Sequence, residues 1–106
     1  MDKNKHVINQ IVSIIVSSVA PDRIILFGSY ARGDNGNNSD IDLLILKKGL
    51  KNERVLINHL YLTFFREKIS TPVDIIALDY DKYDSLSNEK SYFYKTIKQE
   101  GKILYG

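Results

Sequence analysis

Apolar residues occur along the chain either at helical spacing or in short runs, and these two patterns predict its helices and strands. In residues 4–20 the apolar positions follow one another at spacings of three and four, so they share one face of a helix. Pro21 marks the end of that helix. The positions on this face are Ile8, Ile11, Val12, Ile15 and Val19.

Short apolar runs bounded by Gly, Pro or Lys predict strands. Arg23–Phe27 stops at Gly28, and Ile41–Leu46 is closed by two lysines and a glycine. Pro72 introduces a third strand, Val73–Leu78, and Ile103–Tyr105 adds a short final one.

Two later stretches favour helices. Residues 52–68 place Val55, Leu56, Leu60 and Phe64 on one face, and Ser87–Glu100 is followed by Gly101. The order of elements is therefore helix, strand, strand, helix, strand, helix, which predicts an α/β structure: a small mixed β-sheet with helices packed on it. With 106 residues, the chain is expected to form a single domain, residues 1–106.

Composition narrows the class of protein. Apolar residues make up 43% and charged residues 26% of the chain, as in soluble globular proteins. The formal net charge of +2 is too small to indicate nucleic-acid binding. There is no cysteine, which excludes disulfides and thiolate metal sites, and no apolar stretch approaches the roughly 18 residues of a membrane span. We therefore expect a cytoplasmic protein.

Two acids open the second predicted strand. Asp40 and Asp42 are two residues apart, so their side chains point to the same face. An Asp-x-Asp pair at a strand end is ordinarily a solvated pair, but here it leads into a buried strand. Carboxylate oxygens suit Mg²⁺, and two such ions hold both oxygens of a phosphoryl displacement.

The third acid is Asp74, which interrupts the apolar run Val73–Leu78. Acids are seldom buried unless they are paired or bind metal. If this strand lies beside the one with Asp42, the three carboxylates cluster; otherwise Asp74 lies on an edge strand in water.

A loop before the acids suits an anion. Gly28 and Ser29 directly follow a strand, and the amides of a following helical turn would face a phosphate. An ordinary turn is the alternative. Arg32 either contacts phosphate or braces the loop through Asp34.

His6 and His59 have no ligand partner at metal spacing, and Tyr92 and Phe93 are expected in the core rather than as a base-stacking platform.

The string Gly28-Ser29, ten residues, then Asp40-x-Asp42 resembles the signature of the DNA polymerase β nucleotidyltransferases, and its minimal nucleotidyltransferase branch in particular. The resemblance implies the polymerase β-type fold. It also implies that Gly28 and Ser29 hold the triphosphate of ATP. Asp40 and Asp42 would bind two Mg²⁺ ions, and Asp74 would complete the catalytic metal site and help activate the acceptor hydroxyl.

The resemblance further implies a partner. Minimal nucleotidyltransferases are typically paired with a small all-helical HEPN-domain toxin, and they act as antitoxins by adding AMP to one of its tyrosines. Two alternatives stay open: nucleotidyl transfer to a small molecule, and a catalytically idle nucleotide-binding or partner-binding module. Nucleic acid is not expected as the acceptor, because no basic footprint is evident.

Overall fold

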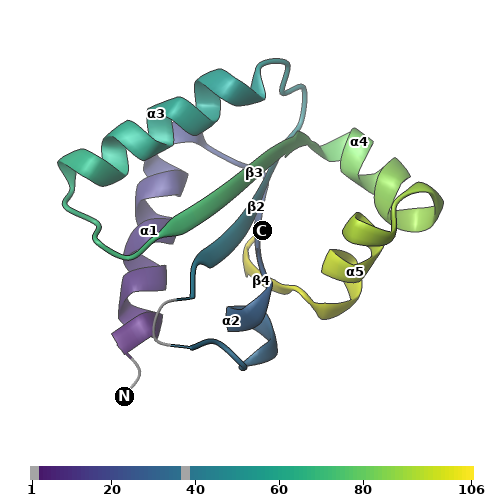
Figure 1. Cartoon of the computed structure of the whole chain (residues 1–106). Coiled ribbons are helices and arrows are strands. Elements are labelled where there is room, and N and C mark those ends of the chain that lie inside the picture. Colours follow the sequence, from purple (N-terminus) through teal and green to yellow (C-terminus); the bar gives the residue numbers. More distant parts are fainter. Residues whose placement is uncertain (1–2, 37–38) are drawn as a thin grey trace.

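The computed structural model describes residues 3–36 and 39–106, which form one four-stranded sheet with helices on both faces (Figure 1). The strands are β1 (Arg23–Phe27), β2 (Ile41–Lys47), β3 (Val73–Asp79) and β4 (Lys102–Tyr105). They lie in the order β3-β2-β1-β4. β1 pairs antiparallel with both β2 and β4, whereas β2 and β3 are parallel. The predicted mixed sheet is therefore confirmed.

One face of the sheet is covered by two long helices, α1 (Lys3–Val19) and α3 (Glu53–Arg66). The predicted apolar stripe of α1 supplies Ile11 and Ile15, which are fully buried. α3 begins where the side chain of Asn52 accepts a hydrogen bond from the amide of Val55 at 3.2 Å. These helices and the sheet enclose the larger apolar core.

The opposite face carries a smaller core under three C-terminal helical pieces. These are α4 (Tyr80–Ser85), a π-helical turn η1 (Leu86–Lys90), and α5 (Tyr92–Glu100). The prediction of one continuous helix over Ser87–Glu100 was wrong, because this stretch is divided between η1 and α5. Two separate starts explain the difference, because the side chain of Asp79 accepts from the amide of Lys82 and that of Ser91 accepts from the amide of Tyr94.

The link between β1 and β2 contains the short helix α2 (Ser29–Arg32), which is the helical turn expected after Gly28. β1 ends, and β2 and β3 begin, at one edge of the sheet, because Phe27 pairs with Asp42 and Ile41 pairs with Val73. The amide of Ile41 also donates to the carbonyl of Pro72 at 2.9 Å. This edge, which borders α2, is where the predicted site residues gather. No helix in the described part of the chain is long and apolar enough to cross a membrane.

Candidate active site

Two of the three predicted acids lie side by side. Asp42 on β2 and Asp74 on β3 are register partners in the parallel pairing, so both project from the sheet face that α4 and α5 cover farther along. Asp40 lies two residues before Asp42, just ahead of β2, and both Asp40 and Asp74 are exposed. The sheet therefore brings the three acids to one edge, as we expected if their strands were neighbours.

Asp42 is in an unfavourable environment for a charge. Partial burial raises the pKa of its carboxyl group, and the nearby carboxylates of Asp74 and Asp40 raise it further, while Arg32 lowers it by a smaller amount. The ionised carboxylates thus repel one another across this edge of the sheet. A cation placed among them would relieve that repulsion.

Gly28 brings the backbone against this acid. Its φ of 74° and ψ of −155° belong to a region that is essentially open to glycine alone. A β-carbon at this position would also overlap Oδ2 of Asp42. Ser29 then starts α2, whose first turn closes on the carbonyl of Gly28 through the amides of Ala31 and Arg32, both at 3.1 Å. Gly28 is therefore held directly beside Asp42, and Ser29 follows it as the first residue of α2.

Of the two roles that the sequence left open for Arg32, the structure shows the contact with Asp34 that braces the loop. Its Nε donates to Oδ2 of Asp34 at 3.1 Å, and both side chains are exposed. Gly33, with a φ of 83°, ends α2 in the left-handed conformation and allows this pairing. The guanidinium is nevertheless close enough to Asp42 to lower the pKa of its carboxyl group. Arg32 therefore sits at the rim of the site with its charge partly engaged by Asp34.

The donor set suits a hard divalent cation. Three carboxylates at one edge of a sheet supply the oxygen ligands that Mg²⁺ prefers, and the pKa of Asp42 is raised by burial first and then by repulsion from Asp74 and Asp40. Within residues 3–36 and 39–106, no three acidic or histidine side chains stand close enough together to ligate a single ion as they are oriented here. The metal role of Asp40, Asp42 and Asp74 therefore stays a prediction.

Two aromatic residues were misplaced by the sequence reasoning. Tyr92 is 86% exposed and Phe93 is 47% exposed, so neither is a core residue. The ring of Phe93 meets that of Phe27 edge-on, with 5.9 Å between centroids, and Phe27 directly precedes Gly28. Phe93 is therefore a neighbour of the site that sequence spacing did not find. His6 and His59 are both exposed, as expected.

This fold and this constellation of residues define a nucleotidyltransferase. Residues 9–106 match the polymerase beta nucleotidyltransferase family, and the chain belongs to that family. It is 32% identical over 85 residues to "Putative protein adenylyltransferase MJ0604" of Methanocaldococcus jannaschii, a match covering 78% of this chain and 77% of that protein. It is also 70% identical over 27 residues to "Putative protein adenylyltransferase MJ0141" of the same organism, a match that spans only 26% of this chain and 27% of that relative.

Two solved structures share the fold. A crystal structure of a toxin–antitoxin with AMP-PNP aligns with a TM-score of 0.66 and 23% identity, over 92% of this chain and 72% of that one. A structure described as a putative nucleotidyltransferase from Sulfolobus solfataricus aligns with a TM-score of 0.53 and 33% identity, over 76% of this chain and 70% of that one. The polymerase β-type fold expected from the motif is thereby confirmed.

Proposed function

We propose that this chain transfers AMP from ATP to a hydroxyl group of a partner protein, with a tyrosine of a small all-helical HEPN-domain toxin as the acceptor, and that it acts as the antitoxin of that pair. The observation that carries the proposal is the placement of Asp42 beside both Asp74 and Gly28 at one edge of the sheet. The names of the adenylyltransferase relatives and the toxin–antitoxin neighbour support the choice of reaction and partner.

The two sides of the site suit different parts of the reaction. Gly28 and Ser29, which follow β1, would hold the triphosphate with backbone amides and a hydroxyl. Asp74 lies on the edge strand β3, and in this proposal the acceptor approaches along the open edge of that strand. In this proposal the acceptor lies on the β3 side and the phosphates lie on the β1 side, with Asp42 on β2 between them.

The proposed reaction is the transfer of AMP to the acceptor hydroxyl. The acceptor oxygen forms a bond to the α-phosphorus, the bond from that phosphorus to the oxygen leading to the β-phosphate breaks, and pyrophosphate leaves. Asp74 would orient the acceptor hydroxyl and receive its proton. Two Mg²⁺ ions, held by Asp40, Asp42 and Asp74, would neutralise the charge on the attacking and leaving oxygens. Arg32 would add positive charge near the phosphates. Catalysis by such a site is mostly positioning and charge neutralisation.

The test is incubation of the chain with ATP labelled on the α-phosphate, Mg²⁺ and its co-purified partner. We expect label on a partner tyrosine, located by mass spectrometry. Asp42→Asn should abolish the transfer, while Asp81→Asn, which changes an exposed acid on α4, should leave it unchanged. Label on RNA ends or on a small molecule, with no protein adduct, would contradict the proposed acceptor.

A further inference from the structure

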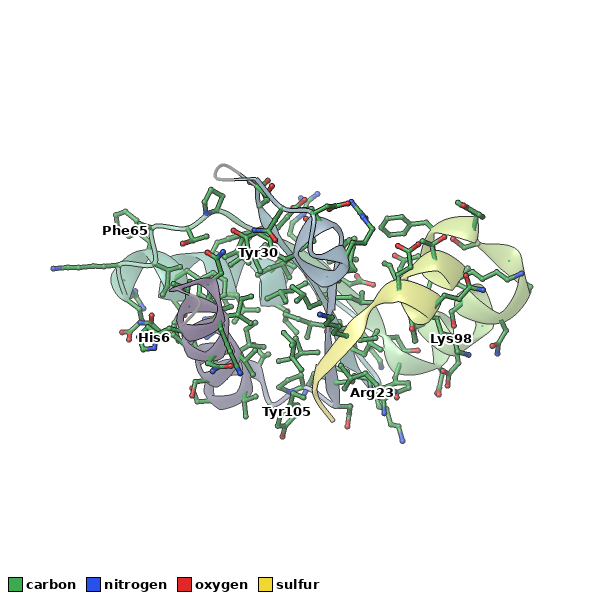
Figure 2. All side chains as sticks on the ribbon, turned by 90° about the horizontal axis from the view of Figure 1, so that it is seen from below. His6, Arg23, Tyr30, Phe65, Lys98 and Tyr105 are labelled. Atoms are coloured by element: carbon green, nitrogen blue, oxygen red, sulfur yellow. The ribbon has the colours of Figure 1, made fainter. Side chains whose placement is uncertain are left out.

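The outward face of α3 exposes large apolar side chains to solvent. Val55, Leu62 and Phe65 are exposed by 62%, 48% and 81% of their surfaces. Their spacings of seven and three place them on one side of the helix, opposite the buried side that holds Leu56, Leu60 and Phe64. Phe65 projects at the outer margin of the molecule (Figure 2). This surface, formed by Val55, Leu62 and Phe65, is called the α3 face below.

The charges around the α3 face are mostly basic, and Glu67, exposed at the end of the helix, is the acidic exception. Arg54 and Arg66 are exposed beside the apolar residues, and Lys68 is exposed just beyond the helix. Glu53 is the single acid of α3, and its spacing from Leu56 and Leu60 places it toward the buried side, where it is half-buried. An apolar surface with a basic rim is complementary to an apolar surface with an acidic rim.

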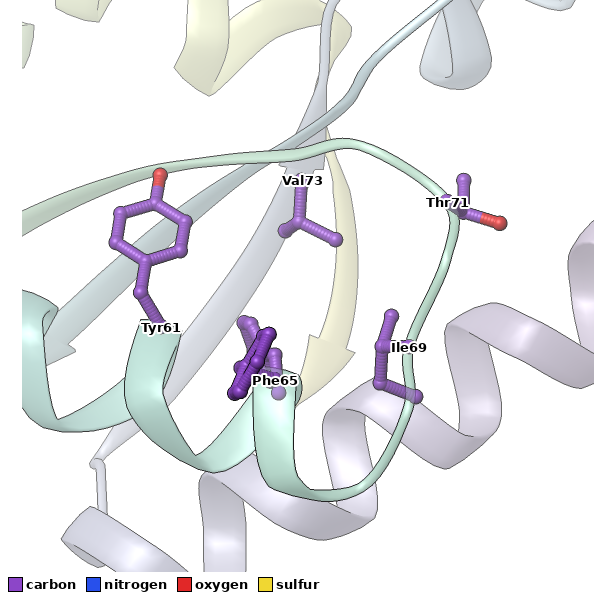
Figure 3. Close-up of a pocket in the computed structure, with 6 residues that line it drawn as sticks. Tyr61, Phe65, Ile69, Thr71 and Val73 are labelled. Carbon is purple, nitrogen blue, oxygen red and sulfur yellow. The ribbon is translucent and has the colours of Figure 1, made fainter.

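One end of the α3 face leads to the acceptor side of the active site. Phe65 borders an open hollow that Tyr61, Ile69, Thr71 and Val73 also line (Figure 3). The hydroxyl of Tyr61 accepts a hydrogen bond from the amide of Ile75 at 3.1 Å, which fixes α3 against the outer edge of β3. Val73, at the rim of this hollow, directly precedes Asp74. Val73 and Asp74 point to opposite faces of β3, so a molecule covering the hollow would reach the candidate catalytic acid by extending around the open edge of that strand.

We infer that the α3 face and this hollow dock an amphipathic helix of the acceptor protein, one whose apolar side chains are flanked by aspartate or glutamate. The inference rests on the proposed function for the identity of the acceptor. A helix is the matching shape, because the apolar residues of the α3 face follow helical spacing over three turns and would pack against a similar stripe. Docking there leaves the phosphate side, at Gly28 and Ser29, free for the nucleotide.

The test uses two synthetic helical peptides with the same leucine stripe, one flanked by glutamates and the other by lysines. Fluorescence anisotropy would measure the binding of each to the full chain. We expect the glutamate peptide to bind at least tenfold more tightly. Phe65→Ser should weaken its binding at least tenfold, and Arg66→Glu should reverse the preference between peptides. Tyr92→Ser, which removes an equally exposed aromatic ring from α5, should bind as the wild type does.

Each outcome decides the inference. Equal binding of the two peptides, binding of neither, or unchanged binding by Phe65→Ser would overturn it, as would displacement of the peptide by a single-stranded oligonucleotide. The thermal shift caused by Mg²⁺–ATP, measured on the same samples, reports the nucleotide site separately. A wild type that binds the acidic peptide but gains no stability from Mg²⁺–ATP would retain the docking surface and refute the proposed function.

Discussion

Gly28 and Asp42 face each other so closely that a methyl group on the glycine would occupy the space of the carboxylate oxygen Oδ2. The two residues come from different segments, the end of β1 and the start of β2, and the pairing of Phe27 with Asp42 sets their separation. The loop suited to phosphate and the acid suited to metal are thus one structural unit. A change at either residue is expected to disturb the other.

The first prediction is that Gly28→Ala destabilises the fold and abolishes nucleotide transfer. The backbone conformation alone should cost about 1–3 kcal/mol for a residue with a side chain, and the overlap with Asp42 adds to it. Gly33→Ala is the matched control, because Gly33 also has a positive φ but has no atom within 4 Å of a new β-carbon. Urea unfolding should show a larger loss for Gly28→Ala. Equal losses would mean that the Asp42 contact is unimportant.

The second prediction concerns the charge at Asp42. Because its pKa is raised in the folded state, the folded state binds a proton more tightly than the unfolded state does. The free energy of unfolding should therefore fall as the pH rises from the unfolded pKa through the folded one, and the loss persists at neutral pH. In chelator, Asp42→Asn should unfold at a higher temperature than the wild type. The gain in the free energy of unfolding should be on the order of 1 kcal/mol, because solvent screens the repulsion.

Adding Mg²⁺–ATP should reverse that difference. Ligand that binds only the folded wild type stabilises it by mass action, and the variant lacks one of the charges that we propose hold the metal. Thermal melts of both proteins, with chelator and with Mg²⁺–ATP, check this. A variant that melted lower in chelator and gained as much from Mg²⁺–ATP would show that these acids do not form a repelling metal cluster.

The third prediction separates the two roles of Arg32. If its charge acts on phosphate, Arg32→Ala should raise KM for ATP several-fold, whereas Asp34→Ala, which frees the guanidinium, should leave KM unchanged or lower it. The exposed Arg32–Asp34 pair should contribute less than about 1 kcal/mol to stability, so the two variants should melt alike. Equal increases in KM would indicate that Arg32 only braces the loop. Steady-state kinetics with ATP as the varied substrate makes this measurement.

The fourth prediction concerns alkaline unfolding. Burial raises the pKa of the Tyr83 hydroxyl, with a smaller opposing effect from Arg23. The stabilisation from the neutral phenol is therefore complete below the unfolded pKa of about 10 and is lost as the pH rises through the folded value. Tyr83→Phe should lose stability less steeply above pH 10. Tyr92→Phe, which changes an exposed ring, should follow the wild-type curve, and chemical unfolding at pH 8 to 11 would compare them.

From the sequence we predicted the elements that have a clear pattern of apolar residues, and we missed the boundaries between the short C-terminal helices. The stripe of α1 could be predicted because burial of one helix face gives apolar spacings of three and four, and β2 because burial on both faces gives an almost unbroken apolar run. Asp79 and Ser91 were available as helix N-cap signals, and they would have separated α4 from α5.

The candidate site likewise combines features that local spacing predicts with features that depend on strand order and register. Spacing places Asp40 and Asp42 on one face, but the neighbourhood of Asp42 and Asp74 depends on the order of strands, which local patterns do not encode. The contact between Gly28 and Asp42 depends in turn on the register of β1 against β2. Phe93 is apolar but 47% exposed, because apolar character alone does not decide whether a side chain is buried.

The pairing of β1 with β4 joins residues 24 and 105, near opposite ends of the sequence. During synthesis, β1 and the β2 strand that follows it emerge long before the segment that covers the other edge of β1. Contacts between such distant segments form slowly, because a long loop must close first. Until residues 102–105 arrive, the strand that ends at Gly28 keeps an open edge, so a nascent chain is exposed to wrong pairing during that interval. Ribosome-bound chains truncated before residue 102 should accordingly be more sensitive to protease than the released protein.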